Sequence, residues 1–171
     1  MKIELASDTM TPDLLERMRR VEDMSPAMEQ MGKKMVEWAM GSWRKPGNRP
    51  TEWPPLKDET VAAKTRRSKK TRTGKAIKNW SPRMVPMMLM QTGQLQRSSF
   101  VAGFDSKSVT VANNRPAGNW SLAEIHQKGA PKAKIPARPF FPFYRDGRAM
   151  PQFVEMCRRI LARWLEKGEA R

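Results

Sequence analysis

The densest chemical signal in the sequence is a run of basic residues between Lys57 and Arg83. These 27 positions hold 10 lysines and arginines but only two acids, Asp58 and Glu59. Such a density of cations can neutralise several phosphates, and its mutual repulsion favours an extended chain until a partner binds. We predict a contact with DNA or with a partner protein for eight of the cations: Lys64, Arg66, Arg67, Lys69, Lys70, Arg72, Lys75 and Lys78.

Recognition of individual bases is not indicated by this run. Trp80 is its one aromatic residue, whereas sites for single-stranded nucleic acid interleave several aromatic side chains with the cations. The sequence also lacks the signatures of helix-turn-helix, zinc-finger and RNA-recognition domains. Three interpretations therefore stay open: a phosphate contact without sequence specificity, a contact with an acidic protein surface, and a solvated loop.

No set of residues assembles into a catalytic site. His126 is the one imidazole, and no serine lies in a nucleophile-elbow pattern. Residues 73–76 (TGKA) resemble the end of a phosphate-binding loop, but the upstream glycine and the hydroxyl after the lysine are missing. Cys157 is the one cysteine, which excludes an internal disulfide and argues against a zinc site. We expect no enzymatic activity, no metal and no cofactor, and a structural hydrogen-bonding role for His126.

Composition is compatible with a folded, strongly basic protein. The chain has 171 residues, 39% of them hydrophobic, and a net charge of +16. We expect a single domain over 1–171. The longest apolar run, residues 84–90, is far shorter than the roughly 20 residues that span a bilayer. We therefore expect no membrane association and a location in the cytoplasm.

Hydrophobic spacing predicts helices at both ends of the chain. Residues 11–43 contain two Thr-Pro or Ser-Pro starts, followed by apolar residues at helical spacing. A methionine stripe that includes Met28, Met31 and Met35 is interpreted as core or as subunit packing. Residues 44–91 are predicted to be a Pro-rich and basic extended loop, in which Trp53 folds back onto the core. Residues 147–167 read as an amphipathic C-terminal helix with Cys157 on its apolar face.

The middle of the chain changes to the period of a strand. Two alternating runs within residues 97–112 predict a β-hairpin, and residues 92–141 as a whole are predicted to be β-rich. The expected fold class is therefore α+β: a small antiparallel sheet built on this hairpin, packed by the N-terminal helices and the C-terminal helix, with a long basic loop.

Four short segments, in this order, carry a resemblance to a known family. They are residues 53–56 (WPPL), 92–98 (TGQLQRS), 125–129 (IHQKG) and 135–140 (IPARPF). Together they resemble the phage virion morphogenesis family, which includes the tail completion proteins of tailed bacteriophages. The residues that match its motifs are Trp53, Leu56, Thr92, Gly93, Leu95, His126, Gln127, Gly129, Ile135, Pro136, Arg138, Pro139 and Phe140.

The resemblance implies a structural virion protein that needs no cofactor and is not an enzyme. Such a protein completes the tail or joins it to the head, as part of an oligomeric ring in the neck around the DNA path. The implied partners are other copies of the chain in a ring, a hexamer being one option, together with neighbouring neck, connector or tail proteins and non-specific contacts with packaged DNA. It would lie in the virion neck or upper tail, and in the host cytoplasm before assembly.

The motif residues also have physical interpretations of their own. We expect Gly93 to supply a turn before the hairpin, and Arg138 to make a bidentate contact with a carboxylate or with backbone carbonyls. His126 and Gln127 are expected to tie down the 135–140 segment through hydrogen bonds. The alternative function is a small basic protein that binds nucleic acid without sequence specificity. The expected subunit interface comprises Met28, Met31, Met35, Met87, Met88 and Leu89.

Overall fold

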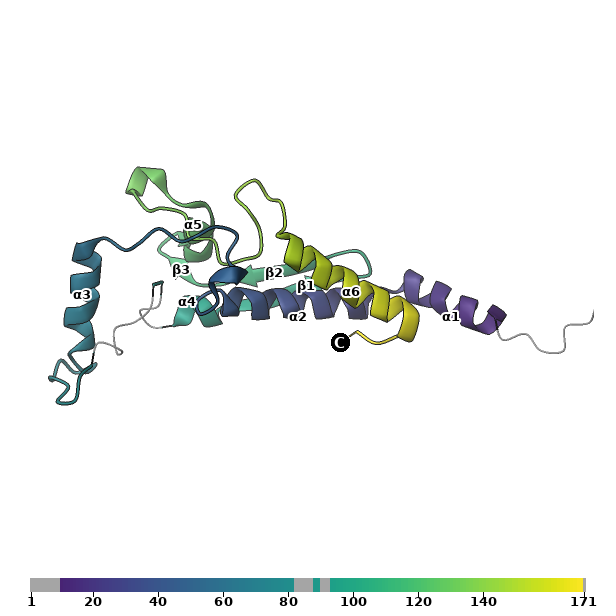
Figure 1. The fold of residues 1–171 in the computed structure, drawn as a ribbon, viewed down its shortest axis with the longest axis horizontal. Coiled ribbons are helices and arrows are strands. Elements are labelled where there is room, and N and C mark those ends of the chain that lie inside the picture. Colours follow the sequence, from purple (N-terminus) through teal and green to yellow (C-terminus); the bar gives the residue numbers. More distant parts are fainter. Residues whose placement is uncertain (1–9, 82–87, 90–92, 171) are drawn as a thin grey trace, which may run out of the picture. The chain divides into compact units, whose positions relative to one another are not determined.

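The computed structural model describes residues 10–81, 88–89 and 93–170, and its fold class is α+β, as predicted (Figure 1). The helices are α1 Met10–Glu22, α2 Ser25–Gly41, α3 Asp58–Ser68, α4 Gln94–Arg97, α5 Leu122–Lys128 and α6 Pro151–Lys167. The strands are β1 Ser99–Phe104, β2 Val109–Asn113, β3 Pro116–Ala117 and β4 Trp120–Ser121. Two 3-10 turns, η1 Pro46–Asn48 and η3 Pro131–Ala133, complete the described elements.

The contacts divide the chain into two compact units. Unit 1 contains the described parts of Met1–Val36, Phe100–Ala112 and Met150–Arg171. Unit 2 contains Glu37–Ser99 and Asn113–Ala149, again in their described parts. Each unit has its own cluster of buried apolar side chains.

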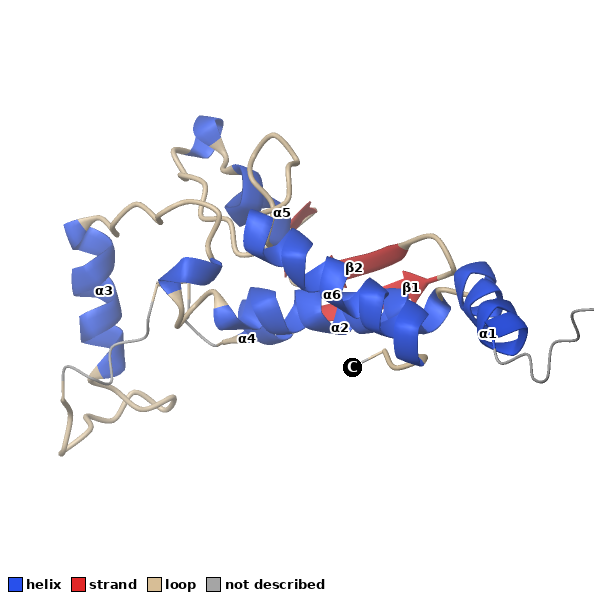
Figure 2. Ribbon diagram, turned by 45° about the vertical axis from the view of Figure 1, so that its right-hand side comes forward, coloured by secondary structure: helices blue, strands red, loops and turns tan. Residues whose placement is uncertain are grey.

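The core of unit 1 joins the first part of α2 to α6 and to the hairpin. Ala27 and Met31 of α2 are buried against Ile160 of α6. The antiparallel pair β1 and β2 packs against α2 (Figure 2). A Cβ at Gly32 would lie 2.6 Å from a methyl carbon of Val109. The glycine therefore lets the strand approach the helix more closely than any side chain would.

The hairpin packs against α2 through its valine face, which is opposite to the face that carries its phenylalanines. Val101 and Val109 face α2 at Gly32, whereas Phe100 and Phe104 are 43% and 46% exposed. The residue type on an alternating strand therefore does not reveal which face the helix covers. The tip is closed by Asp105, whose carboxylate accepts hydrogen bonds from the following backbone amides at 2.6 and 2.7 Å.

Helix α1 docks onto α6 through polar contacts. The indole Nε1 of Trp164 donates to the carbonyl of Arg20 at 3.0 Å, and the Arg20 guanidinium donates to the carbonyl of Leu165 at 3.1 Å. The guanidinium thereby supplies a donor to a carbonyl in the last turn of α6, where the helix itself offers no N–H. The predicted apolar stripe of α1 is left exposed: Leu14, Leu15, Met18 and Val21 show 53–60% of their surface.

The structure corrects the prediction of an extended loop over 44–91. Asp58–Ser68 forms helix α3, with no buried residue. Its acids stand in the first turn and its arginines in the last turn, so that both groups oppose the ends of the helix dipole. This arrangement stabilises a helix that has no apolar stripe. The chain then turns back at Thr71–Gly74 and pairs Lys70 with Ala76.

Candidate functional site

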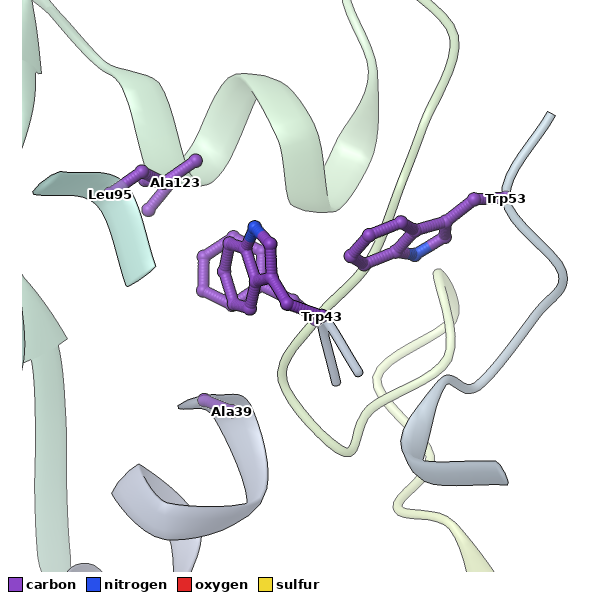
Figure 3. Packing of buried hydrophobic residues seen from close by; sticks show 6 residues of the cluster. Ala39, Trp43, Trp53, Leu95 and Ala123 are labelled. Carbon is purple, nitrogen blue, oxygen red and sulfur yellow. The ribbon is translucent and has the colours of Figure 1, made fainter. Parts of the chain in front are cut away.

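The motif segments of the family resemblance meet in the core of unit 2. Its buried side chains come from five separate stretches of chain, and Figure 3 shows Trp43 with Trp53 on one side and Leu95 and Ala123 on the other. The Trp43 and Trp53 rings meet edge to face, with their centroids 5.8 Å apart. Phe140 packs on Trp43 at 4.8 Å. Aromatic pairs of this kind add stability beyond the apolar area that they bury.

Trp53 pins the Pro-rich segment, as predicted. Its ring is 5% exposed, and its Nε1 donates to the carbonyl of Pro139 at 2.7 Å. The guanidinium of Arg49 lies over the same ring at 4.1 Å and donates to the carbonyl of Ser42 at 2.7 Å. Arg49 therefore covers the tryptophan and satisfies a carbonyl near the end of α2 with one side chain.

Arg138 makes the predicted contact with backbone carbonyls. Its Nε and Nη2 donate to the carbonyl of Pro54 at 3.2 and 3.1 Å, and Nη2 also donates to Pro55 at 3.2 Å. The side chain is 7% exposed. Because prolines have no amide to form a regular ladder, the guanidinium fork is what fastens this proline pair to the 135–140 segment.

Gln127 and His126 both hold that segment, but by different means. The Gln127 amide oxygen accepts from the backbone amides of Phe140 and Phe141 at 3.2 Å each, and its nitrogen donates to Phe143 at 3.0 Å. His126 contributes its backbone carbonyl, which accepts from the amide of Arg138 at 2.6 Å. The sequence therefore indicated the right residues but not that the histidine acts through its main chain.

The His126 imidazole is half-buried, and its Nδ1 has no hydrogen-bond partner among the described residues. Burial first, and the nearby positive charge of Arg138 second, lower the pKa of this imidazole. The neutral form is therefore favoured in the folded chain.

Gly93 forms the predicted turn. It caps the N-terminus of α4 with a φ of 71°, in the left-handed region that favours glycine, and Leu95 of the same turn is buried. Its neighbour in the motif, Thr92, lies outside the described residues, as does Met87. The motif residues Leu56, Ile135 and Pro136 lie on the wall of a cavity in unit 2.

This cavity is the site where chemistry-bearing side chains gather. Its volume is about 550 Å³, and leucines 56, 89, 95 and 122 supply apolar walls together with Ile135. Its charged lining residues are all cations: Lys57, Lys64, Arg115, Lys134 and Arg138. None of the described lining residues is an aspartate or a glutamate. We call this space the cationic cavity.

Sequence reasoning identified two of these five cations, Lys64 and Arg138, and assigned them to different sites. Lys57 begins the basic run but is not among the eight predicted contact residues, and Arg115 and Lys134 lie far from that run along the chain. Only the fold of unit 2 brings them to one cavity.

The predicted basic contact residues do not form a single site. Lys64 is half-buried on the wall of the cationic cavity. The other seven are exposed on the last turn of α3 and on the turn that follows it. Trp80 packs beside this segment, with its Nε1 donating to the hydroxyl of Ser68 at 2.9 Å and the Lys69 ammonium 4.9 Å from its ring centre.

The predicted interface methionines are only partly available. Met31 is 7% exposed within the core of unit 1, which corrects its assignment to a subunit contact, because α6 of the same chain covers that face of α2. Met28 is partly buried against the same core, and Met35 is half-buried. Met88 and Leu89 pack against the core of unit 2.

The chain matches no known family model, no curated protein and no solved structure. Among the described residues, no cluster of histidine, cysteine and acidic side chains could hold a metal ion. No helix in the described part of the chain has the length and apolar character needed to cross a membrane.

Proposed function

We propose that this chain is a structural assembly protein of a tailed bacteriophage. In this proposal it completes the tail or joins it to the head, as one subunit of an oligomeric ring in the neck around the DNA path. It acts without catalysis and without a cofactor. Before assembly it is in the host cytoplasm, and afterwards in the neck or upper tail of the virion.

The proposal is supported by the hydrogen bonds that the motif residues make. The side chains of Trp53, Gln127 and Arg138 form hydrogen bonds with backbone groups of other segments, and these bonds hold separate segments of unit 2 together. The ordered motifs of the resemblance thus act as one packing arrangement. A protein whose distinctive residues build a scaffold suits a structural role better than a chemical one.

Exposed apolar surface supports assembly into a ring. Five large side chains of α1 are more than half exposed, from Met10 at 83% to Leu15 and Met18 at 53%. A contiguous apolar stripe of this kind is typical of a surface that another chain covers. Rings of identical subunits form when such contacts join different faces of neighbouring copies and close.

A direct test is to disrupt the gene in a phage that carries it and to image the lysate by electron microscopy. We expect unjoined heads and tails, and complementation by the intact chain. The double variant Leu14→Glu/Met18→Glu should fail to complement and should form no higher oligomers in light scattering, because it places two charges on the apolar stripe. Both side chains are exposed, so we expect the fold of the variant to be unchanged. Arg19→Glu, which adds the same side chain to the same helix but removes no apolar side chain, should complement. Normal particles without the protein would refute the proposal.

The second candidate function is non-specific binding of nucleic acid. It is favoured by the seven exposed cations on the end of α3 and the following turn. It predicts that the free chain binds duplex DNA with an affinity that falls steeply with salt, with a log–log slope of several units. Arg66→Gln and Lys70→Gln together should reduce that slope by about two, whereas the assembly function predicts weak binding by the free chain.

A further inference from the structure

The cationic cavity of unit 2 gathers positively charged side chains along its wall. Lys57, Lys64, Arg115, Lys134 and Arg138 line it, and no acidic side chain does so among the described residues. Like charges that share a concave space repel one another, and low-dielectric walls strengthen that repulsion. An anion in the cavity would turn this repulsion into attraction.

Burial makes the arrangement more costly than a surface patch would be. Lys64 is half-buried on the cavity wall, and this burial lowers the pKa of its ammonium. Arg138 is held by the carbonyls of Pro54 and Pro55, which are neutral acceptors and leave its charge in place. The fold thus places two of the five cations, Lys64 and Arg138, where water solvates them less well, as binding sites for anions do.

The backbone around the cavity is strained. Leu89 and Lys134 are the two residues other than glycine that have a positive φ in the described chain, at 58° and 54°. Both line this cavity. A side chain in the left-handed region costs free energy, and such residues collect at ligand sites where the strain sets the position of a group. Here it sets the position of the Lys134 side chain at the cavity wall.

We propose that the cationic cavity binds an acidic peptide segment of a partner protein. A carboxylate of the peptide would meet the lysines and arginines, and an adjacent apolar side chain would fill the leucine-lined part of the cavity. The volume of about 550 Å³ lies within the usual range of 300–1,000 Å³ for ligand pockets and suits one or two side chains. This inference rests on the proposed function only in expecting the partner to be a protein of the same assembly.

The chemistry of the lining favours a peptide over nucleic acid. None of the described lining residues is a tryptophan, tyrosine or phenylalanine, so that bases would find no stacking platform. Leu56, Leu95 and Leu122 instead offer apolar surface, which a phosphate backbone cannot use. Opposite charge supplies steering and specificity, and apolar contact supplies affinity, as in other protein interfaces.

The test selects ligands from a displayed library of random dodecapeptides, with the full chain as bait. We expect the selected peptides to be rich in aspartate or glutamate next to large apolar residues. The best peptide is then labelled and titrated by fluorescence anisotropy. Arg115→Glu and Lys134→Glu should each weaken its binding at least tenfold. The matched reversals Lys70→Glu and Arg72→Glu, on exposed cations that do not line the cavity, should change it less than threefold.

Lys134→Gly keeps the test independent of folding defects. Glycine suits the φ of 54° at this position, so we expect a higher melting temperature than that of the parent chain but weaker peptide binding. A dodecamer of deoxythymidine serves as the nucleic-acid probe. It should compete poorly with the peptide and should be insensitive to Arg115→Glu.

Three results would overturn the inference. One is selected peptides without acidic residues, and another is equal losses for the cavity variants and for Lys70→Glu, which would indicate diffuse attraction. The third is competition by the oligonucleotide that disappears with Arg115→Glu, which would assign the cavity to nucleic acid. Because binding is measured on the isolated chain, it can succeed or fail whatever happens to virion assembly in the gene disruption.

Discussion

Two buried tryptophans in unit 2 differ in the hydrogen bonding of their indole Nε1, and that difference predicts unequal losses of stability from the same substitution. Trp53 and Trp43 are 5% and 2% exposed and touch each other. The Nε1 of Trp53 donates to the carbonyl of Pro139 at 2.7 Å. The Nε1 of Trp43 is buried and has no partner in the described chain. Replacement by phenylalanine removes the same atoms at both sites, so the loss of apolar area is similar.

The hydrogen-bonding terms then decide the outcome. Trp53→Phe leaves a buried acceptor on Pro139 without its donor, which costs about 1–3 kcal/mol beyond the lost area. Trp43→Phe removes an unpaired buried donor and recovers about 1–3 kcal/mol, which offsets part of the lost area. We therefore expect Trp53→Phe to lower the free energy of unfolding by at least about 2 kcal/mol more than Trp43→Phe does.

Urea denaturation followed by far-UV circular dichroism measures this difference without depending on the fluorescence of the replaced ring. For a chain of this length, about 2 kcal/mol corresponds to a difference of roughly 4–8 °C in Tm. Equal m-values for the two variants would show that the same surface unfolds in each. If Trp43→Phe costs as much as Trp53→Phe, the indole of Trp43 has a partner and the reasoning about its unpaired donor fails.

Three further predictions concern other parts of the chain. Gly129→Ala should cost about 2–4 kcal/mol in thermal unfolding, because its φ is 79° and the new Cβ would lie 2.9 Å from the Ala137 nitrogen, whereas Gly103→Ala meets nothing within 4 Å and should cost under about 0.5 kcal/mol. The lowered pKa of His126 means that the unfolded chain takes up the proton first, so stability should fall as the pH drops below 6.5, and urea midpoints of His126→Gln should vary less between pH 7 and 5. Burial raises the pKa of the Cys157 thiol, so a thiol reagent at pH 8 should label it slowly in the folded chain and at once in urea.

Hydrophobic period was sufficient to predict the helices and strands that carry an apolar face. The helical spacing in residues 11–43 and 147–167 corresponds to α1, α2 and α6, and the alternation in 97–112 corresponds to β1 and β2. Helix α3 was missed because its stability comes from charges placed against its dipole rather than from an apolar stripe. A high density of cations alone predicts an extended chain, because the cations repel one another. The order of the charges, with acids in the first turn and arginines in the last, instead favours a helix.

The candidate site was predictable only in its local parts. Trp53 and Arg138 stand in segments whose prolines limit the backbone, so the role of their side chains could be inferred. The cationic cavity could not be predicted, since Lys57, Arg115 and Lys134 meet only through tertiary structure. Periodicity also shows that α1 has an apolar face but not whether the same chain or another covers it.

The division into two units has a consequence for the order in which the chain can fold as it is synthesised. The core of unit 1 pairs Ala27 and Met31 with Ile160, so it cannot close until α6 has left the ribosome. Unit 2 is complete in sequence by Ala149 and can form first. A nascent chain that has not yet released α6 therefore lacks the docking site of α1, and α1 takes its final position only after α6 has formed.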